Sequence, residues 1–394
     1  MEEVVIVRAK RSPIGSFGGI LKSVSAVELG TSIAQSLLES ANLEPFQVDE
    51  VIVGNVLATG NGQNIARQIS IKAGIPETSS AFTVNKVCGS GLKAILLGAQ
   101  SIMLGENDVV IALGTENMSQ APYVLQDERW GKKMGNSVVI DTILSDGLTD
   151  AFSGEHMGVT AENIAEKYQL TRQEQDEFAL NSQKKVKHAL ETNRFKEELI
   201  DITITNPRNK EMDIVSLDEY PRPSITIDKL GRLKPAFKIG GTVTAGNASG
   251  INDGAAGVML MSYKKAKELD MEILGHIEAF ASAGVDPNYM GLGPVPSIKK
   301  VIDKSGLSLT DIDLFELNEA FAAQSIAVIK ELDLDEDKVN VNGGAIALGH
   351  PIGASGAKVV VSLLHEMQKR KDTYGIASLC IGGGQGISIL LKRG

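Results

Sequence analysis

Two cysteines of this chain occupy positions where a thiol could act as a nucleophile or a base. Cys88 lies in the segment NKVCGSGL, between an apolar run and the start of an expected helix, and Cys380 precedes the glycine-rich turn of SLCIGGGQG. A helix N-terminus favours negative charge, so the sequence predicts that the pKa of the Cys88 thiol is lowered. Either cysteine could instead be a small buried hydrophobic residue. A disulfide between them is disfavoured, because two cysteines so far apart in a sequence typical of the cytosol more often stay reduced.

Two further segments could supply a base and an amide. His350 lies among small residues in GGAIALGHPIGASGA, and a turn of this kind could expose the imidazole to take a proton from a thiol. A purely structural histidine is the alternative, and no second His or Cys lies nearby at the spacing of metal ligands. Asn318 follows an apolar run and opens an expected helix, where it could cap the helix or orient a water or an oxyanion.

The composition indicates a large α/β enzyme and not a nucleic-acid-binding protein. The chain has 394 residues, of which 43% are hydrophobic and 4% aromatic, with 41 glycines, so it can bury a large core. A formal net charge of −10 argues against nucleic acid as a partner. A local basic cluster could bind ligand phosphates or could be a solvated loop face, and it comprises Arg222, Lys229, Arg232 and Lys234. The glycine-rich loop 240–250 matches neither nucleotide-binding pattern, which disfavours a nucleotide-fold enzyme.

No targeting or membrane segment is expected. The acidic start Met1-Glu2-Glu3 precedes an apolar run that is too short for a signal peptide, and no run approaches the roughly 20 residues of a membrane span. The sequence therefore predicts a cytoplasmic protein without a membrane partner.

The periodicity predicts two α/β halves separated by an insertion. Strands are expected at 4–7, 50–56, 81–87, 108–113, 257–262, 272–281, 314–317, 338–341, 374–379 and 386–392. Helices are expected at 26–40, 64–73, 92–104, 172–191, 295–305, 319–331 and 354–369. Ser25 and Glu28 form a predicted capping box. The strand, turn and helix around Cys88 are echoed around His350, so a duplicated fold would bring Cys88, His350 and Cys380 near one junction.

Four motifs together resemble the thiolase family, and they occur in the family's order along nearly the whole chain: NKVCGSG, NEAF, GHPIGASG and CIGGG. The resemblance implies an α/β fold with a five-layered αβαβα core of two duplicated halves and an inserted loop domain. The implied units are 1–118 (completed by about 250–270), a loop or lid domain 119–249, and 271–394. A homodimer or homotetramer is also implied.

The resemblance also implies roles for single residues. Cys88 matches the acyl-accepting nucleophile and His350 the base that activates it. Cys380 matches the acid and base that exchanges a proton with substrate carbon, and Asn318 the residue that holds a water in an oxyanion site. The amides of Cys88 and Gly382 would hold the other oxyanion. This set fits carbon–carbon bond formation, which needs a covalent acyl carrier, a base and donors for two oxyanions.

Other matched positions concern substrate binding. Those that narrow the acyl pocket in short-chain members are His156, Met157, Met290 and Phe321, although either methionine could simply fill a gap. Arg222 and Ser249 match positions that contact coenzyme A. Glu155 departs from the aromatic residue that is frequent in biosynthetic members. The resemblance therefore does not predict the details of the pocket wall on the coenzyme A side.

The implied activity is that of an acetyl-CoA C-acetyltransferase of lipid metabolism, which reversibly condenses two acetyl-CoA into acetoacetyl-CoA. It would need no metal and no tightly bound cofactor, since coenzyme A is a substrate or product. One alternative is a broader 3-ketoacyl-CoA thiolase of a degradative pathway, which shares every catalytic residue. The other is a non-catalytic acyl-CoA or lipid carrier, for which Cys88, His350 and Cys380 would be unnecessary.

Overall fold

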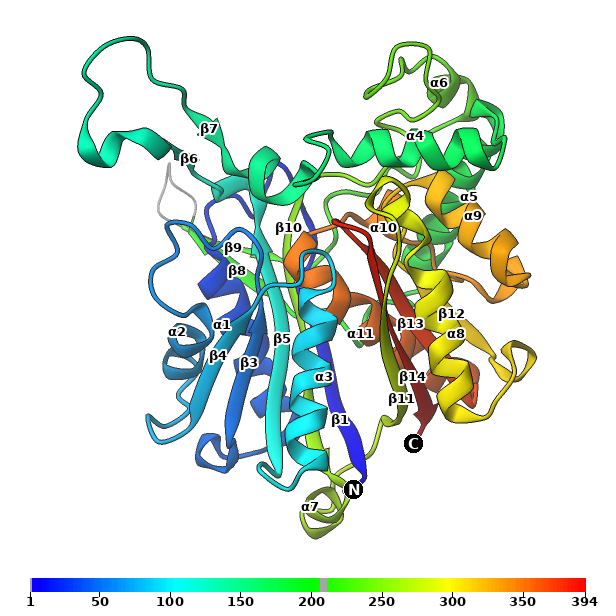
Figure 1. The fold of residues 1–394 in the computed structure, drawn as a ribbon. Helices are drawn as coiled ribbons and strands as arrows, with labels where there is room; N and C mark the ends of the chain where they lie inside the picture. The colour runs from blue at the N-terminus through cyan, green and yellow to red at the C-terminus, as the bar shows by residue number, and fades with distance from the viewer. Residues whose placement is uncertain (1, 206–210) are drawn as a thin grey trace.

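A computed structural model of the chain describes residues 2–205 and 211–394 (Figure 1). Within this part of the chain a ten-stranded sheet runs through the molecule. In spatial order its main strands are β12 (Leu314–Leu317), β13 (Tyr374–Ile381), β14 (Gln385–Arg393), β11 (Gly275–Gly284), β1 (Val4–Arg11), β10 (Asn252–Ser262), β5 (Val109–Asn117), β3 (Glu50–Gly54) and β4 (Ser80–Val84), and β2 (Gly15–Ser16) pairs with β10.

The sheet divides into two halves where β1 meets β11. These two strands share only two paired positions, Val5 with His276 and Ile6 with Gly275. In the first half, β3 is parallel to β4 and β5, and β10 is antiparallel to β5 and β1. In the second half, β12 is parallel to β13, and β14 is antiparallel to β13 and β11. Each half therefore joins a parallel part to an antiparallel part, as expected for a duplicated fold.

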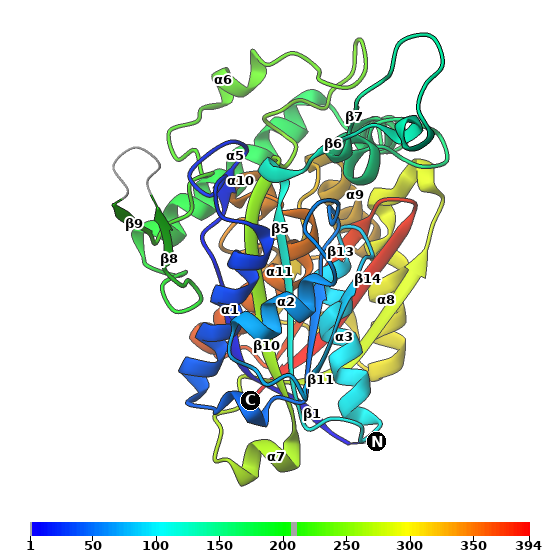
Figure 2. The same ribbon diagram turned by 90° about the vertical axis from the view of Figure 1, so that its left-hand side faces the viewer.

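Helices on both sides of each half complete five layers (Figures 1 and 2). The central layer holds α3 (Ser90–Met103) and α11 (Ile352–Arg370), whose apolar side chains pack into one cluster with both halves of the sheet. Helices α1 (Ala26–Ala41) and α2 (Ile65–Lys72) cover the outer face of the first half. Helices α8 (Pro294–Ser305) and α9 (Ala322–Leu332) cover that of the second. The chain thus has the αβαβα core that the resemblance implied.

Motif glycines allow the two central helices to approach closely. A Cβ atom on Gly91 would lie 2.7 Å from the backbone N of Ala357, and one on Gly356 would lie 2.3 Å from that of Leu92. Real Cβ atoms do not tolerate such contacts, so only glycine fits at either position. These glycines belong to the segments that carry Cys88 and His350, and the close approach brings those two segments together.

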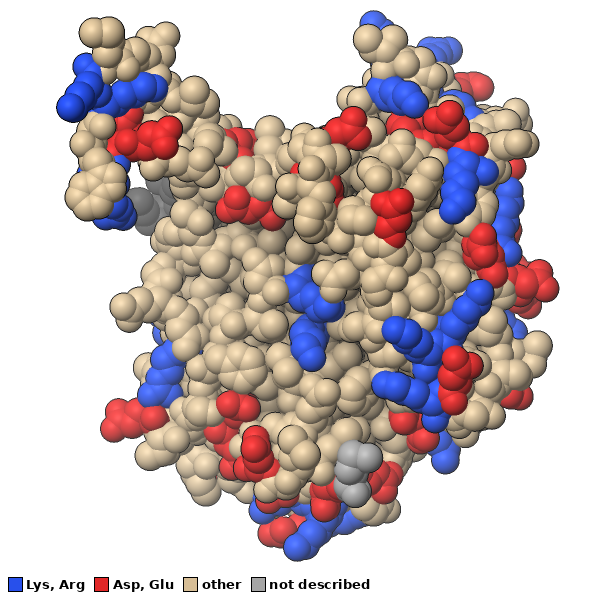
Figure 3. All heavy atoms as spheres, in the orientation of Figure 1, with Lys and Arg blue, Asp and Glu red and all other residues tan. Residues whose placement is uncertain are grey.

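Between β5 and β10 the chain leaves the core. This part contains the hairpin of β6 (Tyr123–Val124) and β7 (Ile140–Asp141), α4 (Met157–Lys167), α5 (Arg172–Glu191), the pair β8 (Ile202–Thr205) and β9 (Met212–Val215), and α6 (Ile227–Gly231). Figure 1 shows the β6–β7 hairpin projecting at the upper left and α4, α5 and α6 at the upper right. In Figure 3 the surface between them is hollowed. We refer to residues 119–249 as the lid.

Most predicted elements are present, including the helix 172–191 and the Ser25–Glu28 capping box. The predicted strand 338–341 is wrong. Residues Glu336–Lys338 form a 3-10 turn, and Val339 makes only an isolated bridge to Phe315. Asn340 explains this, because it adopts a left-handed φ of 45° and its side chain bonds both backbone polar groups of Leu317. Over the described ranges, no helix has the length and apolarity needed to cross a membrane.

Candidate active site

A cavity of about 450 Å³ lies where the two halves and the lid meet. Its lining includes ten of the residues predicted from the sequence: Cys88, His156, Met157, Arg222, Ser249, Met290, Phe321, His350, Cys380 and Gly382. The remaining one, Asn318, lies directly behind this wall, with its Nδ2 atom 3.5 Å from Nε2 of His350. Segments separated by hundreds of residues thus meet around one space.

Cys88 sits in a strained turn between β4 and α3. Val87, which precedes it, has a φ of 47°, a value that is rare for a β-branched residue and that occurs mainly at functional sites. Two side chains hold this turn. Asn85 Oδ1 accepts the Val87 amide at 2.9 Å, and Ser90 Oγ donates to the Val87 carbonyl at 2.6 Å. The local sequence therefore fixes the backbone that presents the thiol.

The prediction that the Cys88 thiol has a lowered pKa is wrong for this structure. Burial raises the pKa to about 11, and the nearby Glu116 raises it further. The amides of Gly382 and of Cys88 itself bond the sulfur and oppose this shift, but burial outweighs them. The two amides that point at the sulfur are those expected to hold an oxyanion. Without substrate, the thiol is neutral.

His350 is buried and neutral. Its Nδ1 lies 2.5 Å from Ser355 Oγ, which donates its own proton to the Pro351 carbonyl at 2.9 Å. Nδ1 must therefore carry a hydrogen, and the lone pair lies on Nε2. Burial, with a contribution from the charge of Lys358, lowers the pKa of His350 to about 3. The imidazole is thus available as a base at neutral pH.

Asn318 does not cap a helix. Helix α9 begins at Ala322, and the N-cap position belongs to Phe321. The Asn318 backbone amide bonds the Ser378 carbonyl at 3.0 Å, which ties the residue to β13. Within the described residues, its buried Oδ1 has no hydrogen-bond partner. Because buried polar groups rarely lack partners, this geometry favours an amide that orients a polar ligand.

Cys380 is the next-to-last residue of strand β13 and lies inside the apolar part of the site. It is buried, and burial together with the neighbouring Cys88 raises the pKa of its thiol. Both cysteines are free. Cys380 packs in one cluster with Met157, Met290 and Phe321, so these residues enclose the end of the cavity next to its thiol.

Aromatic rings extend this apolar wall. His156 is the N-cap of α4, and its ring stacks on Phe237 with centroids 4.6 Å apart. Phe237 in turn meets Phe321 edge-on at 6.2 Å. Stacking fixes the orientation of these rings, and the packed wall restricts the room for an acyl chain.

The lid supplies the rim of the cavity. Arg222 lies over the ring of Tyr220 at 5.5 Å, and its backbone amide bonds Gln183 Oε1 at 2.8 Å. Of the four basic residues singled out in the sequence, only Arg222 lines the cavity. The Ser249 amide bonds the Ala320 carbonyl at 2.9 Å. Glu155 is exposed and does not line the cavity.

Several residues of the site were not found from the sequence. Ser355 lies in the histidine motif, and its distance of five residues from His350 is a signal that could have been used. Asn252, whose Oδ1 accepts the His350 backbone amide at 2.9 Å, gives no local signal, and neither do Phe237 and Tyr220. In the described part of the chain, no group of three His, Cys, Asp or Glu residues is placed to hold a metal ion.

Comparisons with known proteins match the whole chain. The family model described as the thiolase N-terminal domain covers residues 4–264, and that of the thiolase C-terminal domain covers 271–393. An acetyl-CoA acetyltransferase of Pseudomonas aeruginosa is 54% identical over 393 residues, which is 100% of each chain. The Bacillus anthracis acetyl-CoA acetyltransferase structure has a TM-score of 0.98 and 47% identity, covering 100% of this chain and 99% of that one. Human mitochondrial 3-ketoacyl-CoA thiolase in complex with CoA has a TM-score of 0.96 and 43% identity, covering 100% and 98%.

Proposed function

The chain belongs to the thiolase family of acyltransferases, and we propose that it is an acetyl-CoA C-acetyltransferase. Its reaction would be the reversible Claisen condensation of two acetyl-CoA into acetoacetyl-CoA and free coenzyme A. The observation that carries this proposal is the convergence of two free thiols and one neutral imidazole in a cavity with a closed apolar end. Two acetyltransferases among the similar proteins support the same choice.

In the first half of the cycle, Cys88 attacks the thioester carbonyl while Nε2 of His350 takes the thiol proton. The amides of Cys88 and Gly382 stabilise the tetrahedral oxyanion, and loss of one such donor typically lowers the rate about 10²–10³-fold. Coenzyme A leaves as the thiol after it receives the proton from His350. The product of this step is an acetyl group on Cys88.

In the second half, Cys380 passes its own proton to Nε2 of His350 and, as the thiolate, removes a proton from the methyl group of the second acetyl-CoA. His350 and a water bound to Asn318 are proposed to hold the resulting enolate oxygen from one side. The carbanion then attacks the acetyl group on Cys88, and the Cys88 sulfur departs and takes the proton back from His350 as acetoacetyl-CoA forms. A base with a raised pKa suits this step, because the carbon acid is weak.

Coenzyme A would enter along the lid, with Ser249 near its pantetheine part and Arg222 near its adenine end. An exposed cation on an acidic chain supports the second contact. Coenzyme A is then a substrate and product, and no tightly bound cofactor or metal is proposed. Acetyl-CoA and acetoacetyl-CoA are the proposed small-molecule partners, and nucleic acid is not one.

Chain length separates this function from that of a broader 3-ketoacyl-CoA thiolase, whose fold is nearly as similar. Each extra methylene would have to displace a packed side chain instead of gaining burial worth about 0.8 kcal/mol. We therefore expect coenzyme A release from acetyl-CoA alone. Thiolysis should favour acetoacetyl-CoA and fall steeply by the six-carbon substrate, and Met157→Ala should relax this preference.

Specificity constants for ketoacyl-CoA substrates of increasing length provide the measurement. Met134→Ala is a matched control, because this methionine is 90% exposed and does not line the cavity. It lies in the segment that connects β6 to β7. Equal or better constants for six- to ten-carbon substrates in the unmutated protein would favour the degradative enzyme. Binding of acyl-CoA without turnover would favour a carrier.

We further propose that the protein is cytoplasmic and forms a homodimer or homotetramer. Two free cysteines support a reducing compartment. Strand β4 lies at one edge of the sheet, with Phe82 exposed, and the surface around β4 and α3 carries few charged side chains (Figure 3). An uncovered edge strand is suited to pairing with a second copy. Light scattering would give the assembly, and a monomer would contradict this part of the proposal.

A further inference from the structure

We propose that Lys358 is a positioning residue for His350: its ammonium group holds the turn that carries the imidazole and places a positive charge beside it. The proposal deepens the proposed function, because it rests on His350 acting as the base. Lys358 lies in the second turn of α11, behind the cavity wall, and does not line the cavity itself.

The contact to the turn is direct. Lys358 Nζ donates to the Gly349 carbonyl at 3.0 Å, and the residue is only 4% exposed. Gly349 has a φ of 98°, and a Cβ atom there would lie 2.6 Å from the Asn252 side chain. Asn252 also accepts the His350 amide. The peptide that joins Gly349 to His350 is therefore held by Lys358 at its carbonyl and by Asn252 at its amide.

Lys358 also stands behind Asn318. Together with Glu316 and Asn318 it lines a small internal cavity of about 10 Å³. An ammonium group has three donors, and the Gly349 carbonyl uses one of them. One buried cation thus lies next to both residues proposed to hold the enolate oxygen.

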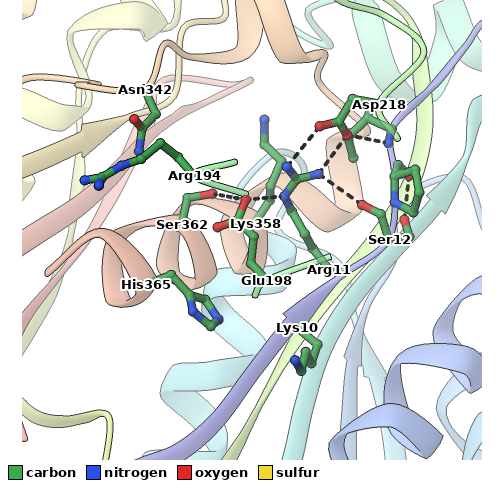
Figure 4. A network of polar contacts seen from close by, with 12 residues as sticks. Lys10, Arg11, Ser12, Arg194, Glu198, Asp218, Asn342, Lys358, Ser362 and His365 are labelled. Carbon is green, nitrogen blue, oxygen red and sulfur yellow. Dashed lines mark hydrogen bonds and ion pairs between the residues drawn. The ribbon is translucent and has the colours of Figure 1, made fainter. Parts of the chain in front are cut away.

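The charges around Lys358 come from several elements. Those that act on it are Arg11 of β1, Asp218 of the lid, Glu316 of β12, Glu319 after β12, and the His350 ring when protonated. Figure 4 shows Lys358 beside Arg11 and Glu198. Arg11 directs its guanidinium to Glu198 at 2.6 Å and to Asp218 at 2.7 Å. The charges of Glu198 and Glu366 raise the pKa of Glu316, and the charge of Lys358 lowers it.

Lysine is almost never fully buried unless it is paired, so its retention here calls for a role. Burial and Arg11 lower the pKa of Lys358 to about 8, so the group is positive below that pH. A positive charge beside His350 opposes formation of the imidazolium. Removing the charge should let His350 hold its proton to higher pH, while removing the contact should loosen the turn.

The test follows the Cε1–H signal of His350 by NMR as a function of pH, which needs neither substrate nor turnover. The signal should shift along an acid limb as His350 becomes protonated. In Lys358→Met this acid limb should move up by about one pH unit or more. Acetyl transfer should fall about tenfold or more in kcat, with KM for acetyl-CoA little changed. Lys358→Arg keeps the charge and should keep the limb near its original position.

Lys369→Met is the matched control, because Lys369 lies on the same helix and bonds the Arg194 carbonyl, away from the turn. Its limb and kcat should be unchanged. If Lys358→Met fails to fold, Lys358→Met/Glu316→Gln removes the charge of Lys358 together with the carboxyl group of Glu316 on which that charge acts. A limb at the original position in either folded variant would overturn the proposal. A parent protein that releases no coenzyme A from acetyl-CoA would instead overturn the proposed function.

Discussion

At the scale of single residues, the reactive pair rests in its uncharged form. Burial raises the pKa of Cys88 to about 11 and lowers that of His350 to about 3, so neither shift favours a preformed thiolate–imidazolium pair. The amides of Gly382 and Cys88 are in place for charge that develops during the reaction. Proton transfer should therefore accompany attack on the substrate instead of preceding it.

Cys88 should react first with limiting iodoacetamide, because Cys380 is more deeply buried. The modified protein should be inactive, and acetyl-CoA should protect it. With a pKa of about 11, the modification rate should still rise with pH above neutrality, where an activated thiol would already have reached its plateau. Peptide mass spectrometry over a pH series measures both. Labelling of Cys380 first, or a plateau near neutral pH, would contradict this account.

Cys380→Ser separates the two thiol roles. The variant should still form an acetyl group on Cys88, because that step uses only Cys88 and His350. Condensation should slow by about 10²-fold or more, since a hydroxyl is a poor substitute for the lost base. Intact-mass analysis detects the acetyl-enzyme, and coenzyme A release measures turnover. An adduct present on the parent protein but missing from the variant would reject this division of roles.

Long helices frame the site at the scale of secondary structure. Periodicity predicted the helix 172–191 at its observed ends, because a long repeat averages over single residues. The strand 338–341 failed because one left-handed asparagine turned the chain, which periodicity cannot detect. The sequence motifs located the cavity residues, since their types carry the chemistry. The raised pKa of Cys88 was not predictable, because it depends on burial by distant segments.

The lid makes a prediction of its own. Arg222→Ala should raise KM for acetyl-CoA more than it lowers kcat, because a remote phosphate contact is present in both ground and transition states. Arg370→Ala is the control, since Arg370 lies at the far end of α11, about 27 Å along the helix from its start. Steady-state kinetics at low and high salt give both constants. An unchanged KM at low salt would show that Arg222 belongs to a solvated loop face and does not bind the phosphates of coenzyme A.

At the scale of the whole molecule, one buried carboxylate joins the two halves. Glu116 at the end of β5 accepts four hydrogen bonds of 2.9–3.1 Å. Three come from Asn55, Val56 and Leu57 of the first half, and the fourth comes from Gly353 at the start of α11. The residues that it fixes pack around Cys88 and follow His350. The position of Cys88 relative to His350 thus depends on a contact outside the cavity.

Glu116→Gln should destabilise the protein, because the amide NH₂ that replaces one carboxylate oxygen cannot accept the two hydrogen bonds that this oxygen accepted. Each buried donor left unpaired costs about 1–3 kcal/mol. Burial raises the pKa of Glu116 to about 7, so urea unfolding is best compared about one pH unit above that value, where the carboxylate is ionised. Glu106→Gln, an exposed change, should stay within about 0.5 kcal/mol. Equal stability of the Glu116 variant would show that the four hydrogen bonds to this carboxylate contribute little to the free energy of unfolding.

The start of the first described strand, β1, and the end of the last, β14, lie at the end of the molecule opposite the lid (Figure 1). A purification tag, a fusion partner or a tether to a solid support at either terminus would therefore point away from the entrance. The immobilised protein should keep its substrate access, which suits it to flow reactors and to surface-based binding measurements.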